Sequence, residues 1–191
     1  MKNINTIQLD NNLFVRLDEN DLTAEIIKSK EVKGDVIIPK VVKYNSKLYI
    51  IKSIGSYSFE YNHFINSISF EEGSEVQSIG KNAFYHCYIK SLTLPAYFNK
   101  FDNEWIHNTL NLTNIDYSPE NKYLNKVNKT FLLFKTNQLS NDFDSLIFAP
   151  RNISGEIEIP SSVKKIGPFA FNLCYRMTSL SFPKASLIQE I

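Results

Sequence analysis

Short triplets of the form apolar–x–apolar recur along the chain, separated by polar turns. They are Val36–Ile38, Ile68–Phe70, Leu92–Leu94, Ile115–Tyr117, Leu146–Phe148, Ile157–Ile159 and Leu180–Phe182. A period of two is typical of a short β-strand with one buried face. Most triplets are followed within two residues by Pro, which lacks the N–H for a further ladder hydrogen bond. The pattern predicts seven short, half-buried strands.

An apolar-Gly frame precedes three of these triplets. It reads SIGSYSFEYN from Ser53, SIGKNAFYHC from Ser78 and KIGPFAFNLC from Lys165. In the regular part of the chain the triplets begin 23 or 24 residues apart, whereas Leu146 lies 31 residues after Ile115 and 11 before Ile157. Repeats of this length stack as the coils of a solenoid. We therefore expect parallel strands on successive coils, with the irregular spacings caused by an insertion.

Each part of the frame has a physical role in such a coil. Gly55, Gly80 and Gly167 permit a sharp turn where a side chain would collide with its surroundings. The Phe four residues after each Gly is expected to fill the interior from a short helical or 3₁₀ turn.

The two cysteines occupy one point of the same frame. Cys87 and Cys174 share the position of Asn62, which indicates an inward residue that satisfies backbone groups of the turn. At about 4.8 Å per stacked strand, the intervening coils would separate them by about 15 to 20 Å. A disulfide needs Cα atoms within about 7 Å. We predict two free cysteines with a structural role.

The chain, 1–191, is interpreted as a single domain. Residues 1–50 lack the frame but cluster apolar residues between Asn/Asp-rich turns, which predicts a β-rich N-terminal cap. Residues 51–119 carry the repeats. The last of these coils is degenerate, and we expect Trp105 in its Phe pocket.

The second part of the chain is less regular. Residues 120–150 are expected to form a β-hairpin insertion in which 131–134 pair with 146–148. Residues 151–191 hold a further repeat, and Ser186–Ile191 closely matches Ser74–Ile79. The match stops one residue before the Gly, so we expect an unfinished C-terminal coil. Self-association through its open edge and a truncated array are the two interpretations.

Composition narrows the function classes. The 191 residues carry 21 Lys+Arg against 20 Asp+Glu, a formal net charge of +1. A near-neutral chain has no electrostatic footprint for nucleic acid or an anionic membrane. The N-terminus shows no signal-peptide pattern, and no window approaches the about 18 to 20 apolar residues of a membrane span. We expect no nucleic-acid partner and no direct membrane insertion.

Catalytic and metal-binding motifs are absent from the sequence. The three histidines, His63, His86 and His107, are interpreted as turn residues at the surface rather than as general bases. His63 and His86 fall at near-equivalent points of adjacent coils, but a metal site needs three or four ligands. We expect no enzyme activity, no cofactor and no metal.

The outward middle residues of the triplet strands form the candidate binding face. This row comprises Ser69, Thr93, Asp116, Ile147, Glu158 and Ser181. Extended faces of this kind serve recognition in repeat proteins. The alternative is a plain solvated β face, because interface hot spots favour Trp, Tyr and Arg, which the row lacks. The turn tyrosines are alternative contacts: Tyr57, Tyr61, Tyr85 and Tyr175.

The repeat resembles that of the BspA-like leucine-rich repeat proteins of bacteria and parasitic protists. The resemblance rests on IG-x-x-AF-x-x-C in two copies, on S-L-x-L-P, and on GEIEIPSSVKKIGPFAF. It covers about residues 34–191, and the stretch 123–159 is most similar to the trichomonad branch.

This resemblance implies a leucine-rich-repeat solenoid. It further implies a surface antigen, at the cell surface or secreted, that adheres through protein contacts to host cells, extracellular matrix or other microbes. Two alternatives stay open on the residues themselves. An intracellular scaffold is favoured by the missing signal peptide and the free cysteines. A truncated repeat fragment without independent function is favoured by the position of the chain end.

Overall fold

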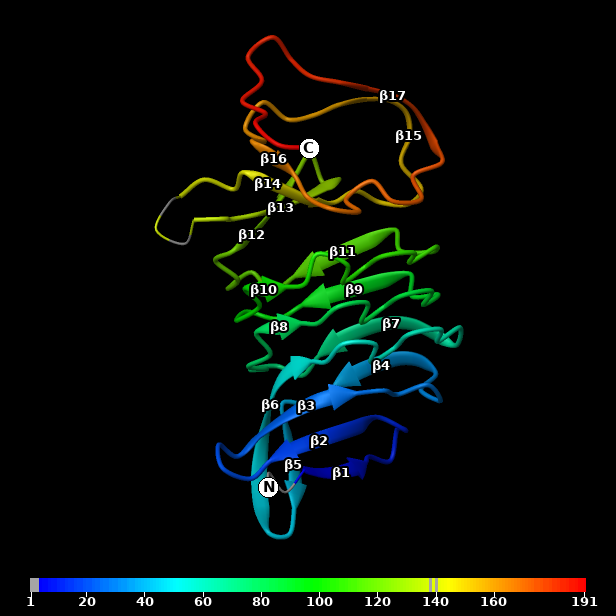
Figure 1. Cartoon of the computed structure of the whole chain (residues 1–191), viewed down its shortest axis with the longest axis vertical. Helices are drawn as coiled ribbons and strands as arrows, with labels where there is room; N and C mark the ends of the chain where they lie inside the picture. The colour runs from blue at the N-terminus through cyan, green and yellow to red at the C-terminus, as the bar shows by residue number, and fades with distance from the viewer. Residues whose placement is uncertain (1–3, 138, 140) are drawn as a thin grey trace.

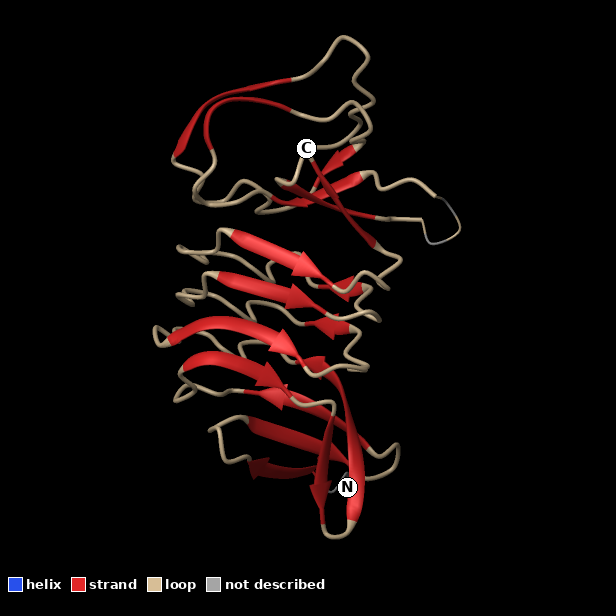
Figure 2. Ribbon diagram, turned by 180° about the vertical axis from the view of Figure 1, so that it is seen from behind, coloured by secondary structure: helices blue, strands red, loops and turns tan. Residues whose placement is uncertain are grey.

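Short strands stacked as a solenoid make up the molecule, from the N-terminus at one end to the last coil at the other (Figures 1 and 2). The computed structural model describes residues 4–137, 139 and 141–191, and within these residues there are 17 strands and no helix. The turns after the frame glycines are therefore not the helical or 3₁₀ turns that the sequence predicted. They are hydrogen-bonded turns, because N–H groups such as that of Tyr57 bond the next coil, here Lys81 O at 3.0 Å, instead of closing a helix.

The first sheet contains the apolar-Gly strands. Its parallel core runs through β3 (Thr23–Ile27), β6 (Lys47–Ile54), β8 (Ser78–Ile79) and β10 (Lys100–Phe101). Its antiparallel members are β1 (Ile4–Gln8) and β2 (Phe14–Asp18) at the N-terminal end, and β5 (Val41–Tyr44), which pairs with β6. The parallel pairing thus begins within residues 1–50, and the chain there already forms the first coil.

The second sheet contains the triplet strands. It comprises β4 (Gly34–Ile38), β7 (Ile65–Phe70), β9 (Ser91–Leu94) and β11 (Asn114–Tyr117), all parallel. Val36 aligns with Ile68, Ile68 with Leu92, and Leu92 with Ile115. The register predicted from the triplet spacing is confirmed in this part of the chain.

A hairpin interrupts the coils after β11. Strands β12 (Leu124–Val127), β13 (Phe131–Phe134) and β14 (Ser145–Phe148) pair antiparallel, and β14 then pairs parallel with β16 (Lys165–Ile166). The predicted pairing of residues 131–134 with 146–148 is present. Beyond it, β15 (Ser154–Glu158) and β17 (Arg176–Ser181) form a separate parallel pair in which Ile157 aligns with Leu180.

The placement of Leu146 corrects the triplet assignment. Leu146 aligns with Ile166 and accepts the Gly167 N–H at 2.8 Å, as Ile54 accepts that of Gly80 at 2.9 Å. The segment Leu146–Phe148 is thus an apolar-Gly strand rather than a triplet strand. The triplet that follows Ile115 in the array is the one at Ile157.

The hairpin also divides the hydrophobic core. Leu132 packs with the N-terminal cluster, which extends from Leu13 to Phe148, whereas its neighbour Leu133 packs with the C-terminal cluster, which extends from Phe131 to Cys174. Because successive strand residues point to opposite faces, the hairpin forms a layer with a core on each side. Both faces are therefore apolar, which explains the uninterrupted run FLLF.

The degenerate coil keeps the frame with different residues. Asp102 takes the place of the Gly, since its N–H bonds Ile79 O at 3.0 Å. In the regular coils, the N–H of the frame Phe bonds the carbonyl of the frame Ala in the next coil, as Phe59 N–H bonds Ala83 O. Phe84 N–H bonds Trp105 O in the same way. Trp105 therefore holds the position of the frame Ala, and Ile106 holds the position of the frame Phe. The expectation of Trp105 in the Phe pocket is therefore wrong. Because this coil lacks the Gly, the sequence alone allows it to be aligned with the repeat in two ways that differ by one residue.

The C-terminal segment begins a further rung of the array. Ile166 N–H donates to Glu190 O at 3.0 Å, and Lys165 pairs with Glu190 in a parallel bridge. This agrees with the sequence match between the ends of the two segments. None of the described residues belongs to a helix that is long and apolar enough to cross a membrane.

Candidate functional site

The predicted polar row divides into two parts. Ser69 aligns with the exposed Ile37, and Thr93 with Asp116, on the second sheet. The remaining pair, Glu158 and Ser181, aligns on the separate β15–β17 sheet.

Ile147 does not belong to the row. Its side chain is 3% exposed and packs in the N-terminal core, because β14 lies between two cores instead of facing solvent. The outward position that Ile147 was expected to share is occupied at the other end of the sheet by Ile37, which is 61% exposed.

The one acid on the second-sheet part of the row is already neutralised. Lys126 Nζ lies 2.5 Å from Asp116 Oδ1, and Asn114 Nδ2 donates to Asp116 Oδ2 at 2.6 Å. Hydrogen bonds from Lys126 and then Asn114 lower the pKa of Asp116 below its ordinary value. The carboxylate stays exposed, but both of its oxygens already have partners within the protein.

A second surface lies on the turns that lead from the first sheet to the second. Aromatic and histidine side chains of successive coils lie there, and seven of the eight contact another ring of the set. We name this surface the aromatic ridge: Tyr57, Tyr61, His63, Tyr85, His86, Tyr88, His107 and Phe169. Tyr61 is 53% exposed and Tyr57 40%. These residues recur at fixed distances from the frame Gly, so the coil geometry brings them together.

Five rings of the ridge form a continuous series of contacts. Tyr61 stacks on His86 with ring centroids 5.1 Å apart and meets Tyr85 edge-on at 5.5 Å. Tyr85 contacts His107 at 5.2 Å, and His107 contacts Phe169 at 4.1 Å. The series therefore crosses from the N-terminal coils over the hairpin to the coil of Gly167.

The remaining histidine has its own ring partner. His63 stacks on Tyr88 at 4.2 Å, so the equivalent residues of adjacent coils pair here as imidazole and phenol. His63 and His86 each stack on a tyrosine, and the described residues contain no group of three or more His, Cys, Asp and Glu that could hold a metal.

The backbone beneath the ridge adopts the left-handed region. Tyr57 has φ 61°, Tyr61 56°, His86 51° and Phe169 60°. This conformation lets the N–H of Tyr61 reach Tyr85 O of the next coil at 2.8 Å. For a bulky L-residue it costs about 1–2 kcal/mol.

Asn is the residue that fits this backbone with least strain. Asn82 stands where Tyr57 stands in the preceding coil, with φ 51°, and Asn108 holds the place of Tyr61 and His86, with φ 55°. Asn tolerates the left-handed region because its short side chain can bond locally.

Two side chains of the ridge, Tyr61 and His107, have shifted pKa values that favour their uncharged forms near neutral pH. Desolvation and then the neighbouring Tyr85 raise the pKa of Tyr61. Desolvation lowers the pKa of His107, with the charge of Glu104 opposing it. Tyr61 is therefore a neutral phenol and His107 a neutral imidazole at pH 7.

Behind the ridge, the inward residue of each turn satisfies backbone groups as predicted. Asn62 Nδ2 donates to Val32 O at 2.9 Å, and its Oδ1 accepts from Phe64 N–H at 2.9 Å. Cys87 and Cys174 are free and buried. Burial raises the pKa of the Cys87 thiol to about 12, so it is not a nucleophile at neutral pH.

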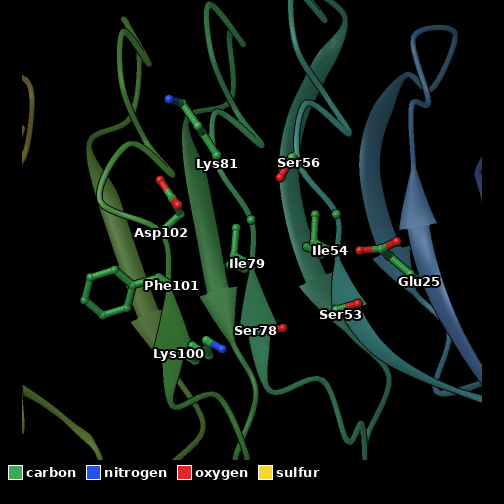
Figure 3. A pocket seen from close by; sticks show the side chains of 12 residues that line it. Glu25, Ser53, Ile54, Ser56, Ser78, Ile79, Lys81, Lys100, Phe101 and Asp102 are labelled. Carbon is green, nitrogen blue, oxygen red and sulfur yellow. The ribbon is translucent and has the colours of Figure 1, made fainter.

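A polar groove crosses the outer face of the first sheet (Figure 3). Ser53 aligns with Ser78, and Ser78 with Lys100, while Glu25 aligns with Ser53 on the opposite side. The groove encloses about 280 Å³. Glu25 is engaged by Arg16, and Lys100 lies at the far end of the row. The two serines lie between an acid and a base that do not converge on them, so this groove offers no nucleophile with its base.

The repeat frame is matched by a known sequence family. The BspA type leucine rich repeat region, in 6 copies, matches residues 52–145 and 141–191. The chain belongs to this family. The first matched residue lies directly before the first apolar-Gly frame at Ser53, so the family match and the observed coils coincide.

Solved structures of other repeat proteins resemble this BspA-type chain. They include a leucine-rich repeat protein from Eubacterium ventriosum, with 16% identity, a TM-score of 0.52, and coverage of 98% of this chain and 61% of that one. The pneumococcal vaccine antigen PcpA has 13% identity, a TM-score of 0.48, and coverage of 95% and 65%. A leucine rich cell surface protein from Faecalibacterium prausnitzii has 15% identity, a TM-score of 0.42, and coverage of 98% and 76%.

The likeness to the Eubacterium ventriosum protein supports the leucine-rich repeat fold. The present chain spans less than two thirds of the length of that chain and of PcpA. The comparison with curated proteins finds no match. As a BspA-type leucine-rich repeat protein, the chain is a repeat scaffold.

Sequence reasoning found part of the ridge. The sequence predicts Tyr57, Tyr61, Tyr85 and Tyr175 as alternative contacts. Tyr61 and Tyr85 contact each other on the ridge, and Tyr57 lies on the same turn as Tyr61, whereas Tyr175 is exposed outside the ridge. The histidines were assigned to turns, but their stacking on tyrosines was missed. The signal was present in the frame, since Tyr61 and His86 both lie six residues after the Gly.

Proposed function

We propose that this BspA-type repeat protein is a non-catalytic binding module whose aromatic ridge contacts a protein partner. The observation that carries the proposal is the placement of exposed Tyr57 and Tyr61 at positive φ, where Asn82 and Asn108 hold the equivalent places. Strained backbone positions that retain bulky side chains indicate a use for those side chains. Asn would fit this backbone with less strain but has no aromatic ring, so we infer that the ring is what these positions provide.

The chemistry of the ridge suits a protein interface. Tyr supplies a large, rigid contact area with a polar tip and loses little conformational entropy on binding. Tyr and Trp are enriched among hot-spot residues. The mutual stacking of Tyr61, His86 and Tyr85 orders the rings before a partner arrives, which reduces the entropic cost of association.

Membership of the BspA type supports adhesion as the biological setting. The partner would be a protein of a host cell, of the extracellular matrix or of another microbe, and the protein would act at the cell surface or after secretion. The polar row of Ser69, Thr93, Asp116, Glu158 and Ser181 is the second candidate contact surface. It ranks lower because Asp116 is already engaged by Lys126.

The test exchanges ridge rings for the residue that the backbone accepts. A triple variant, Tyr57→Asn, Tyr61→Asn and His86→Asn, is compared with wild type for binding to host epithelial cells and to immobilised matrix glycoproteins. The matched control is Tyr97→Asn, since Tyr97 is 55% exposed but lies outside the ridge. A third protein, Thr93→Lys, tests the polar row.

We expect the ridge variant to lose at least tenfold in binding while its melting temperature stays equal or rises, because backbone strain is relieved. Tyr97→Asn should bind like wild type. If Thr93→Lys loses binding while the triple ridge variant binds like wild type, the polar row and not the ridge is the contact surface. If wild type binds none of the cells or matrix proteins, the adhesive function is wrong.

A further inference from the structure

A second hollow lies where the β9–β11 edge meets the chain that follows the hairpin. It encloses about 430 Å³ and is lined by Lys90, Leu110, Asn111, Thr113, Arg151, Asn152 and Arg176. Three cations from distant parts of the sequence therefore meet at one hollow, and no acid lines it. Lys90 directly precedes β9, and Arg176 begins β17.

Arg151 carries a buried charge without a counter-ion. Its side chain is 5% exposed, and its guanidinium donates to Ala170 O at 3.1 Å, Ala149 O at 3.3 Å and Ile106 O at 3.4 Å. Its Nε has no hydrogen-bond partner. Backbone carbonyls satisfy N–H groups but do not neutralise a full positive charge, and a buried unpaired ion is costly.

The neighbouring thiol does not supply the missing negative charge. Cys174 lies beside Arg151, and the nearby guanidinium favours the thiolate. Burial nevertheless outweighs that effect and raises the pKa of Cys174 above its ordinary value. The thiol is therefore protonated at neutral pH.

The other two cations of the hollow are also without acidic partners. Lys90 and Arg176 make no ion pair with any carboxylate in the described part of the chain, whereas eight other basic residues do. A positive hollow thus exists in a chain whose formal net charge is only +1. Lys90 and Arg176 are exposed and Arg151 is buried, and cations that line one hollow without acids favour the entry of an anion.

We propose that this hollow binds a small oxyanion-bearing ligand, a phosphate or sulfate group carried on a sugar-sized molecule. Arg and Lys are the residues that recognise such groups. The volume of about 430 Å³ falls within the range of about 300–1,000 Å³ for small-molecule sites, and exceeds what a bare tetrahedral anion fills. Asn111, Asn152 and Thr113 supply amide and hydroxyl groups for the hydroxyls of the carrier.

The experiment measures saturable binding by isothermal titration calorimetry on the full chain. The probes are inorganic phosphate, inorganic sulfate, glucose 6-phosphate and glucose 6-sulfate, with glucose and sodium chloride as controls. The variants are Lys90→Gln and Arg176→Gln, both at exposed residues that leave the buried contacts of Arg151 in place. Lys122→Gln, an exposed lysine outside the hollow, is the matched control.

We expect saturable binding of at least one sugar ester, weakened about tenfold or more by either hollow variant and unchanged by Lys122→Gln. Preference for the phosphate or the sulfate ester identifies the source of the oxyanion. Tight binding of the inorganic ions alone, or binding that chloride matches at equal ionic strength, would overturn the sugar-sized ligand. Absence of saturable binding up to about 10 mM would overturn the site itself.

Arg151→Met supplies a second readout, because this variant removes the buried charge. A merely structural Arg151 would lower stability in the variant without any change in ligand affinity at Lys90 and Arg176. The proposal requires that a folded Arg151→Met protein bind the ester more weakly than wild type does. If this variant does not fold, the two glutamine variants decide the outcome.

Discussion

Replacement of Gly80 by Ala should separate two coils at a defined point. A Cβ on Gly80 would lie 2.7 Å from the Ser56 backbone nitrogen and 3.0 Å from the Gly55 carbonyl carbon. Both neighbours are backbone atoms of the preceding coil, so no side-chain rotation relieves the contact. The coils must move apart at the place where Gly80 N–H bonds Ile54 O at 2.9 Å.

The same frame offers a matched control. A Cβ on Gly167 would meet Leu146 O at 3.2 Å and nothing else closer than 3.9 Å, a contact that a shift of a few tenths of an ångström relieves. Overpacking costs about 1–3 kcal/mol, and we expect the upper end for Gly80→Ala. For Gly167→Ala the loss of unfolded-state entropy returns about 0.4–1 kcal/mol, so the net change should stay within about 1 kcal/mol.

The assay is urea unfolding followed by the fluorescence of Trp105, the single tryptophan, which is buried in the coil after Gly80. A loss of about 3 kcal/mol corresponds to a fall in melting temperature of about 6–12 °C for a chain of this size. Equal losses in the two variants, within about 0.5 kcal/mol, would refute the argument from coil contact. The close approach of Gly80 to the preceding coil would then not be the reason for Gly at this position.

Three further results are expected. Leu132→Ala and Leu133→Ala should each cost about 2–5 kcal/mol, but in hydrogen exchange the first should expose amides toward β11 and the second toward β15 and β17, since the two residues lie in different cores; one shared pattern would contradict the layer. Iodoacetamide should not alkylate Cys87 in the folded protein at pH 8, because the thiol is buried with its pKa at about 12, and mass spectrometry should find labelling only with unfolding. Lys126→Met should raise the pKa of Asp116 toward its ordinary value in an NMR titration. In wild type the lowered pKa stabilises the fold at pH values above the pKa of Asp116 in the unfolded chain. This contribution is lost as the pH falls through the pKa of Asp116 in the folded protein.

The regular coils could be predicted from the sequence because two independent signals agree there. The period of two set the faces of the triplets, and the Gly set where each coil turns, so Ile68, Leu92 and Ile115 align as expected. The close approach at Gly80 is the physical origin of the second signal.

The hairpin region could not be read in the same way. An apolar run such as Leu146–Phe148 has no polar residue to mark an outward face, and periodicity alone does not tell which sheet it joins. Ile147 was therefore assigned to the surface although it lies in a core. The left-handed backbone beneath the ridge could not be predicted for another reason. Positive φ at Tyr57 and Tyr61 follows from hydrogen bonds to the next coil, which no local pattern encodes.

The hairpin interrupts the core but not the ridge, and this difference bears on function. Leu132 and Leu133 divide the apolar interior into two clusters, so the coils on either side do not need each other's side chains for burial. On the turn side, however, His107 contacts Phe169 at 4.1 Å, and Asn108 N–H donates to Asn172 Oδ1 at 2.9 Å. These ridge contacts, together with the bond from Arg151 N–H to Leu112 O at 3.0 Å, hold the coils on the two sides of the hairpin in register. Core packing alone does not require that register, whereas a partner that spans several coils does, and this favours the ridge over the divided polar row as the contact surface.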